Sequence, residues 1–254
     1  MPPLLLVHGM WSRPSAFGAL IPELEAAGIR TRAPVLLHHD CPPGSPPPPE
    51  LGRIGLDDYV AQIEAEVRAL ARLPVILGHS MGGLIAQRVA ARTGAAGLIL
   101  LATAPSASAR ALSLAQVRTL RRVTGRWGWW KAPTLLDADS ARAGVMNGVS
   151  EAETRPAIAD LTWDSGRVLA QISAPFLDRT RAAAVDYSRI TCPALVLFGL
   201  EDRIATEGTS RATARALAGP VDYETWPDCG HWFFHDAIRP RLAERIGRFM
   251  ASLS

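Results

Sequence analysis

Short apolar runs alternate with amphipathic helical stretches at both ends of this chain. Residues 4–8 form an apolar run followed by glycine, which is typical of a buried parallel strand, and residues 56–73 repeat apolar side chains along one helical face. An order of strand, helix and strand favours a mostly parallel sheet with helices on both faces, so we expect an α/β fold. The other expected strands are 29–37, 75–77, 98–101, 194–198 and 221–225, and the other expected helices are 15–27, 84–91, 210–217 and 238–250.

The alternation stops between residues 105 and 187. Helices are expected there over 112–123, 151–161 and 166–172, and we expect this segment to be a helical cap between two halves of one core, 1–104 and 188–254. Open α/β sheets bind ligands beyond the carboxyl ends of their strands, where such a cap would lie. Four of the seven tryptophans fall in it, and they either line an apolar pocket or hold the small core of the cap.

Composition excludes several classes of protein. The 254 residues carry a formal net charge of only +3 without a basic run, so nucleic-acid binding has little support. Cys41, Cys192 and Cys229 are widely and irregularly spaced, which predicts neither a disulfide framework nor a zinc site and favours a reducing, cytoplasmic setting. The start MPPLLLVHG lacks the charged region of a signal peptide, and the uncharged residues 94–109 fall short of a membrane span. We expect a soluble cytoplasmic protein.

The sequence GHSMGG, residues 78–83, joins an expected strand to an expected helix. It matches G-x-S-x-G, in which a serine on a sharp turn projects its oxygen beyond the sheet while small neighbours make room. The helix that follows directs its first N–H groups at the site and favours developing negative charge. Ser80 is therefore the candidate nucleophile. The alternative is a structural serine in a glycine-rich turn.

A serine needs a base and an orienting acid before it can attack a carbonyl. His231, in DCGHW after the last expected strand, lies where the order serine, acid, histidine requires the base. His235 competes, but it falls where the final helix is expected to start. Asp202, in GLEDR after the preceding strand, is the expected acid, with Glu201 as the neighbour that could be mistaken for it.

Taken together, HGMW, GHSMGG, GLEDR and DCGHW resemble, in order and spacing, the four functional loops of the α/β-hydrolase family. The resemblance is to its lid-bearing branch of esterases, lactonases and C–C hydrolases, and it spans essentially the whole chain. It implies an active site between sheet and lid that uses no metal and no organic cofactor. It also implies Ser80 as nucleophile, His231 as base, Asp202 as its orienter, and the backbone N–H groups of Met10 and Met81 as oxyanion donors.

These expectations converge on a serine hydrolase that cleaves a carboxylic ester or lactone of a small to medium apolar molecule through an acyl-enzyme. The only lysine, Lys131, falls in the cap, which disfavours cyanohydrin chemistry and a serine–lysine dyad.

Metal binding by the run from His38 to Cys41 is not expected, because neighbouring side chains in an extended loop point to opposite sides. The pocket is expected to include Trp11, Trp129, Trp130, Trp163 and Trp232.

Two alternatives stay open at this point. A thioesterase or a C–C bond hydrolase would use the same serine, histidine and aspartate, because the triad does not reveal the leaving group. A non-catalytic ligand-binding protein could also keep this fold.

Overall fold

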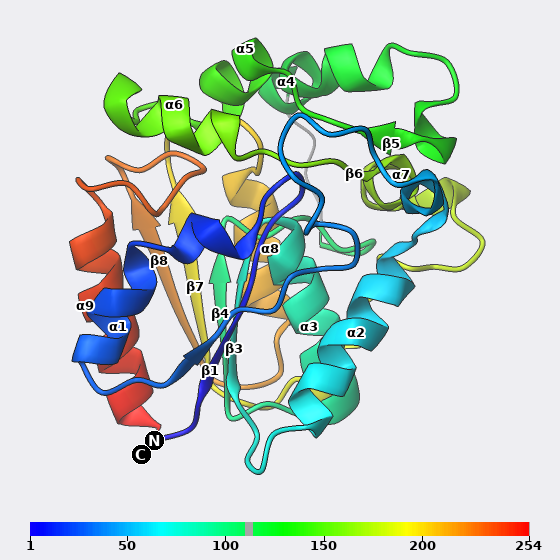
Figure 1. Ribbon diagram of the computed structural model, residues 1–254. Coiled ribbons are helices and arrows are strands. Elements are labelled where there is room, and N and C mark those ends of the chain that lie inside the picture. Colours follow the sequence, from blue (N-terminus) through cyan, green and yellow to red (C-terminus); the bar gives the residue numbers. More distant parts are fainter. Residues whose placement is uncertain (110–113, 254) are drawn as a thin grey trace.

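The computed structural model describes residues 1–109 and 114–253. Its main sheet has six strands, all parallel, in the order β2-β1-β3-β4-β7-β8 (Figure 1). The strands are β1 (Leu4–Val7), β2 (Thr31–Arg32), β3 (Val75–His79), β4 (Gly97–Leu101), β7 (Ala194–Gly199) and β8 (Val221–Trp226). The expected parallel α/β sheet is confirmed.

Helices cover both faces of this sheet because its strands are apolar on both faces. Leu4 and Leu6 pack in one core cluster beneath α1 (Leu20–Ala26) and α9 (Arg239–Ser252). Leu5 and Val7 point to the opposite face, as alternate strand residues do, and pack in a second cluster. Helices α2 (Leu56–Arg68), α3 (Met81–Thr93) and α8 (Glu207–Ala216) lie on that second side.

The strand expected over residues 29–37 is wrong in length, since β2 pairs with β1 only at Thr31 and Arg32. Pro34 has no N–H to donate to a ladder. Two of the N–H groups that follow bond to side chains instead: Leu36 donates to His8 Nε2 at 3.3 Å and Leu37 to Gln62 Oε1 at 2.9 Å.

Other element boundaries differ by a few residues from those expected. The segment 15–27 divides into a 3-10 turn (Pro14–Phe17) and α1, and α2 ends at Arg68 instead of residue 73. Helix α8 begins at Glu207 because the Thr206 hydroxyl accepts the N–H of Thr209 and caps the first turn.

The segment between β4 and β7, residues 105–187, is called the insertion below. It holds α4 (Leu114–Thr124), α5 (Ala138–Ser140), α6 (Glu151–Ala159) and α7 (Gly166–Ser173), and it lies across the carboxyl ends of the strands (Figure 1). Residues 112 and 113 of the helix expected there lie outside the described residues. Two short strands were not expected: β5 (Pro133–Thr134) pairs antiparallel with β6 (Asp164–Ser165). Each has two residues, too few to leave a period in the sequence.

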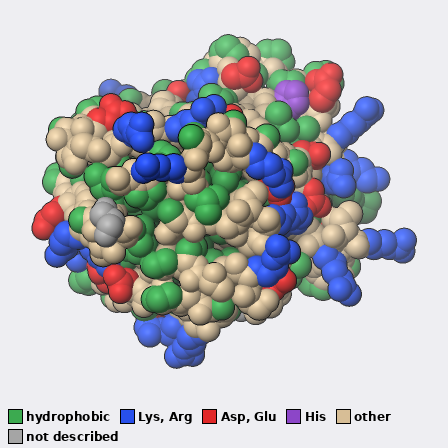
Figure 2. Space-filling view, turned by 90° about the horizontal axis from the view of Figure 1, so that it is seen from below, with side chains coloured by type: hydrophobic (Ala, Val, Ile, Leu, Met, Phe, Trp, Pro, Cys, Tyr) green, Lys and Arg blue, Asp and Glu red, His purple; other side chains and the backbone are tan. Residues whose placement is uncertain are grey.

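Charged side chains are spread over the surface. Figure 2, seen from below Figure 1, shows hydrophobic side chains near the middle of that face and basic ones around it, with acidic ones between. Across the described ranges, no helix is long and apolar enough to cross a membrane.

Candidate active site

Ser80 occupies the turn between β3 and α3 in a conformation unusual for its type. Its φ is 54° and its ψ −121°. Its N–H donates to Leu101 O at 3.0 Å, and its carbonyl oxygen accepts the N–H groups of Gly83 and Ala104, each at 2.9 Å. A positive φ on a residue other than glycine is strained, and it persists where the surroundings enforce it, often at functional sites.

Two glycines make this turn possible. A Cβ on Gly78 would lie 2.2 Å from the Gly82 carbonyl oxygen, and one on Gly82 would lie 2.1 Å from the Val7 oxygen. Both distances are far below van der Waals contact, so any side chain there would force the turn apart. Gly78 and Gly82, which were expected to make room for the serine, therefore cannot be replaced by a larger residue without moving the turn.

Asp202 and His231 form a buried pair at the ends of β7 and β8. Asp202 Oδ2 lies 2.7 Å from His231 Nδ1, and the two side chains are 0% and 4% exposed. The other carboxylate oxygen accepts the N–H groups of Ile204 at 2.7 Å and Ala205 at 2.8 Å. Because the carboxylate accepts the Nδ1 proton, Nε2 is the nitrogen left to take one up.

His79, the residue before Ser80, contacts His231 and is hydrogen-bonded to its backbone. Its Nε2 donates to the His231 carbonyl oxygen at 2.9 Å, and the two rings lie 4.9 Å apart. Complete burial, together with nearby His231, lowers the pKa of His79 to about 3. His79 is therefore neutral near pH 7 and acts as a backbone support for His231.

Ser80 and His231 open onto the same two small cavities, of about 40 and 60 Å³. Met10 and Trp11 line both, and Met81 lines the second. Met81 is the first residue of α3, and the first N–H groups of a helix have no partner within it. The structure thus brings the expected nucleophile, base and oxyanion loop to one place.

The expected pocket tryptophans divide into two groups. Trp11 and Trp232 line the serine cavities. Trp129 and Trp163 instead line a separate cavity of about 300 Å³, and Trp130 packs edge-on against Trp129, with ring centres 6.1 Å apart. Trp129, Trp130 and Trp163 thus lie away from the two serine cavities as far as the described residues define them.

Most of the lining that the sequence missed is aliphatic and comes from the insertion and one core loop. Apolar periodicity in a sequence predicts that such residues are buried, but it does not predict which cavity or neighbouring element they face. These residues are Leu120, Leu136, Val145, Met146, Leu161, Leu169, Ile172 and, from the loop after β7, Ile204.

A family model described as the alpha/beta hydrolase family matches residues 4–244. The chain belongs to this family. It is 33% identical over 81 residues to the pyrethroid hydrolase of Sphingobium wenxiniae. That match covers 32% of this chain and 27% of the relative, so it spans about a quarter of the relative's length.

Solved structures share the fold of this alpha/beta hydrolase over nearly its whole length. A pyrethroid hydrolase from Sphingobium faniae superposes with a TM-score of 0.69 at 22% identity, covering 98% of this chain and 96% of that one. A monoacylglycerol lipase from Paleococcus ferrophilus gives 0.69 at 21% identity, covering 100% and 96%. A methylesterase from Arabidopsis gives 0.73 at 13% identity, covering 99% of both.

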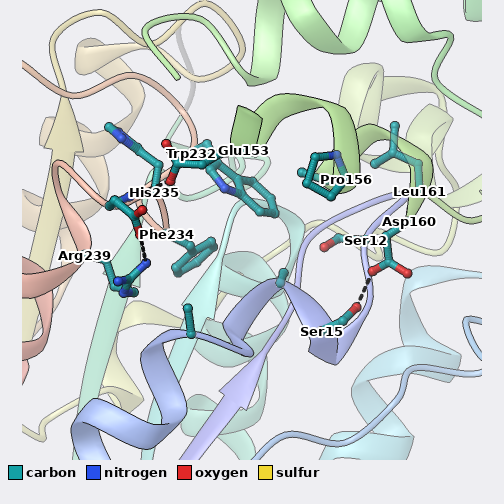
Figure 3. Close-up of a pocket in the computed structure, with 14 residues that line it drawn as sticks. Ser12, Ser15, Glu153, Pro156, Asp160, Leu161, Trp232, Phe234, His235 and Arg239 are labelled. Atoms are coloured by element: carbon teal, nitrogen blue, oxygen red, sulfur yellow. Dashed lines mark hydrogen bonds and ion pairs between the residues drawn. The ribbon is translucent and has the colours of Figure 1, made fainter. Parts of the chain in front are cut away.

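A larger cavity of about 410 Å³ adjoins the serine site of this alpha/beta hydrolase. It shares Ser12, Leu161 and Trp232 with the smaller of the two serine cavities (Figure 3). His235, the competing base, lines this larger cavity, and burial lowers its pKa. Asp160 accepts the Ser15 hydroxyl across the cavity wall, which joins the insertion to the 3-10 turn after β1.

The insertion also holds both loops that carry the buried pair. Asn147 Nδ2 donates to Glu201 O at 2.8 Å, and Arg203 Nη1 donates to Ala143 O at 3.0 Å. On the histidine side, Glu153 Oε1 accepts the N–H of Asp236 at 2.7 Å. The insertion of this alpha/beta hydrolase is therefore bonded to the acid loop and to the loop after His231.

The run from His38 to Cys41 forms no metal cluster. No group of three or more His, Cys, Asp or Glu side chains suited to a metal occurs in the part of the chain that the structure describes. His39 is buried and is bonded to Ser12 and Tyr59 instead.

Proposed function

We propose that this protein hydrolyses carboxylic esters, lactones included, of small to medium apolar molecules through an acyl-enzyme on Ser80. One observation carries the proposal: His231, bonded at 2.7 Å to the buried Asp202, faces the same cavities as a serine held at positive φ. A nucleophile, a base and an orienting acid in this arrangement are the parts that acyl transfer needs.

Each group has a defined part in the reaction. Ser80 Oγ gives its proton to His231 Nε2 and bonds to the ester carbonyl carbon, while the carbonyl electrons move onto oxygen. The backbone N–H groups of Met10 and Met81 hold that oxyanion, and Asp202 stabilises the imidazolium. His231 then protonates the leaving alcohol as its bond to the acyl carbon breaks. In the second half, His231 takes a proton from water, the water oxygen bonds to the acyl carbon, and the bond to Ser80 Oγ breaks as His231 returns the proton to it, which releases the acid.

The lining of the cavities supports an apolar substrate. Leu120, Leu169 and Ile172 contribute aliphatic surface to one serine cavity, and Leu136 and Met146 to the other. Two cavities meeting at one serine provide separate places for the acyl and the alcohol part. The similar proteins whose names describe hydrolysis of pyrethroids, monoacylglycerols and methyl esters agree with this class.

The insertion is proposed to act as a cap, with substrate reaching Ser80 from the larger cavity past Trp232 and Leu161. The unpaired state of the three cysteines supports the proposed reducing, cytoplasmic setting.

Labelling with a fluorophosphonate probe tests the mechanism. We expect one adduct, mapped by mass spectrometry to Ser80 and absent from Ser80→Ala. The matched controls are Ser12→Ala and Ser173→Ala, which alter the other serines of the serine cavities and should keep the label. An unlabelled, folded wild-type protein, or a label on another residue, would refute the nucleophile.

A substrate panel tests the reaction class. p-Nitrophenyl esters of increasing acyl length, lactones, acyl thioesters and diketones are compared as kcat/KM, with Ser80→Ala as the background. We expect esters to be the best substrates. Higher kcat/KM for thioesters or diketones would replace the ester proposal by the corresponding hydrolase.

A further inference from the structure

Trp11, directly after Met10, is held by the insertion through all of its polar groups. Its N–H donates to Asp164 Oδ2 at 3.1 Å, and its carbonyl oxygen accepts the N–H of Thr162 at 3.0 Å. Its indole Nε1 donates to Thr134 Oγ1 at 3.1 Å. The φ of Trp11 is 57°, a left-handed conformation that is strained for a bulky residue. These three bonds therefore enforce a backbone that Trp11 would not adopt by itself.

Asp164 is the charged member of this set. Its side chain is completely buried, and Oδ1 accepts the Tyr59 hydroxyl at 2.9 Å and the N–H of Ser165 at 2.6 Å. Oδ2 accepts the Trp11 N–H and lies 3.4 Å from His39 Nε2. A buried carboxylate is stable only with donors and a counter-charge around it, and here both are present.

The hydrogen bonds of His39 require its imidazole to carry both protons. Nδ1 lies 2.8 Å from the Ser12 carbonyl oxygen, which can only accept, so Nδ1 donates. Nε2 faces Tyr59 Oη at 3.2 Å and Asp164 Oδ2 at 3.4 Å. Since the Tyr59 proton goes to Asp164 Oδ1, Nε2 must donate as well, and His39 is an imidazolium.

The surroundings of His39 agree with that charge. Burial by itself would lower its pKa, but the Asp164 carboxylate and the Ser12 carbonyl oxygen together outweigh burial and raise the pKa above its ordinary value. Two other groups are near: Arg13, which donates to the His39 carbonyl oxygen and whose charge lowers the pKa of His39 by less than Asp164 raises it, and His8, whose ring centre lies 4.9 Å away. Burial lowers the pKa of His8, which keeps that neighbour neutral and removes a repulsion.

We infer that Asp164, paired with His39, is a positioning residue: it anchors the Trp11 N–H, on the carboxyl side of Met10, and thereby holds the Met10 backbone so that its own N–H, in the preceding Gly9–Met10 peptide, points at the oxyanion formed on Ser80. The inference rests on the proposed function. Trp11 and Met10 line both serine cavities, so a rotation of this peptide changes the site directly. The insertion would then complete the oxyanion hole as well as cover the substrate.

The expected size of the effect follows from the donor that is disturbed. Removing one oxyanion donor lowers kcat by about 10²–10³, and a donor that is misaligned instead of lost falls below that. Because the substrate carbonyl carries little charge before attack, KM should change far less than kcat.

The test compares Asp164→Asn with the wild-type enzyme on a p-nitrophenyl ester. The asparagine keeps the shape but loses the charge and presents an N–H group to donors. We expect kcat to fall about 10- to 100-fold with KM within about threefold. The inhibition constant of an aliphatic trifluoromethyl ketone, which forms an oxyanion adduct on serine, should rise in proportion. His39→Gln, which removes the counter-charge, should act in the same direction and serves if Asp164→Asn does not fold.

The matched control is Ser165→Ala. Its hydroxyl donates to Ile54 O at 2.6 Å and accepts the Val168 N–H at the start of α7, so the change also removes a bond between insertion and core, but none to Trp11. We expect it to lower the melting temperature while kcat and ketone inhibition stay near wild type. Folded Asp164→Asn with wild-type kcat, or an equal loss of kcat in Ser165→Ala, would overturn the inference alone. An inactive wild-type protein would overturn the proposed function and the inference with it.

Discussion

At the scale of single residues, the site depends on side chains whose hydrogen bonds leave them one role. Asp202 accepts two backbone N–H groups on Oδ1 and the imidazole on Oδ2, so its carboxylate is fully satisfied only as an anion. Glu201, beside it, is exposed, and its backbone rather than its side chain is used, by Asn147. Adjacent acidic residues thus differ because only one of them faces His231.

Asp202→Asn tests this difference. The amide cannot stabilise the imidazolium and favours the wrong tautomer of His231, so kcat/KM for an ester should fall about 10³- to 10⁴-fold. Steady-state kinetics measure the loss, and circular dichroism checks folding. Glu201→Gln, the neighbouring carboxylate-to-amide change, should stay within about twofold of wild type. Retention of more than a tenth of the activity by Asp202→Asn would contradict the role of Asp202.

At the scale of elements, helix α4 supplies one wall of the serine site. Leu120 is 9% exposed and lines a serine cavity, whereas Val117 on the same helix is 61% exposed. The helix therefore turns one face to the substrate cavity and the other to solvent. We therefore expect its buried face to limit acyl length, and this face can be changed without touching the buried pair.

Leu120→Ala should shift the substrate preference towards longer acyl chains. The lost side chain enlarges the cavity, and a few methylene groups in an apolar pocket change kcat/KM by about tenfold or more. We expect the ratio of kcat/KM for p-nitrophenyl hexanoate to that for the acetate to rise at least about fivefold. The ratio is internal to one variant, so a lower folded fraction does not affect it. Val117→Ala should leave it unchanged, and an equal shift in both variants would show that α4 does not set acyl length.

At the scale of the whole molecule, buried histidines make the stability of the fold depend on pH. The pKa of His79 is lowered to about 3 by burial and by His231. Below its ordinary pKa near 6.5, the unfolded chain binds a proton that folded His79 does not, so stability falls with falling pH. The loss continues until about pH 3, where folded His79 takes up its proton.

His79→Gln should flatten this acid loss. At pH 5 the histidine makes folding less favourable by about 2 kcal/mol relative to pH 7, an amount that the variant lacks. Urea unfolding at pH 7 and pH 5 measures the difference for each protein. The variant should be less stable at pH 7 but should lose less between the two values. His38→Gln, at a half-buried histidine, is the control, and an unchanged pH slope in His79→Gln would contradict the lowered pKa.

Local patterns predicted most of the fold. Short continuous apolar runs located the strands of the core, because a parallel strand is buried on both faces, and period-3.6 apolar repeats located the helices, because each helix buries one face. Boundaries failed where a side chain intervened: β2 stops because His8 and Gln62 take the N–H groups that a ladder would use. The β5–β6 pair was not predicted because strands of two residues are too short to show an apolar repeat in the sequence.

For the site, the sequence by itself determined the candidate serine turn, the order of acid and base, and the glycines that any such turn needs. It could do so because a strand–turn–helix junction and its steric limits are local. Only the tertiary structure decided which tryptophans lie at the serine cavities, since Trp11 and Trp232 reach them while Trp129 and Trp163 line another cavity. The pairing of Asp164 with His39 and Trp11 was likewise decided there, because burial and contact join segments 125 and 153 residues apart, a separation that no local pattern records.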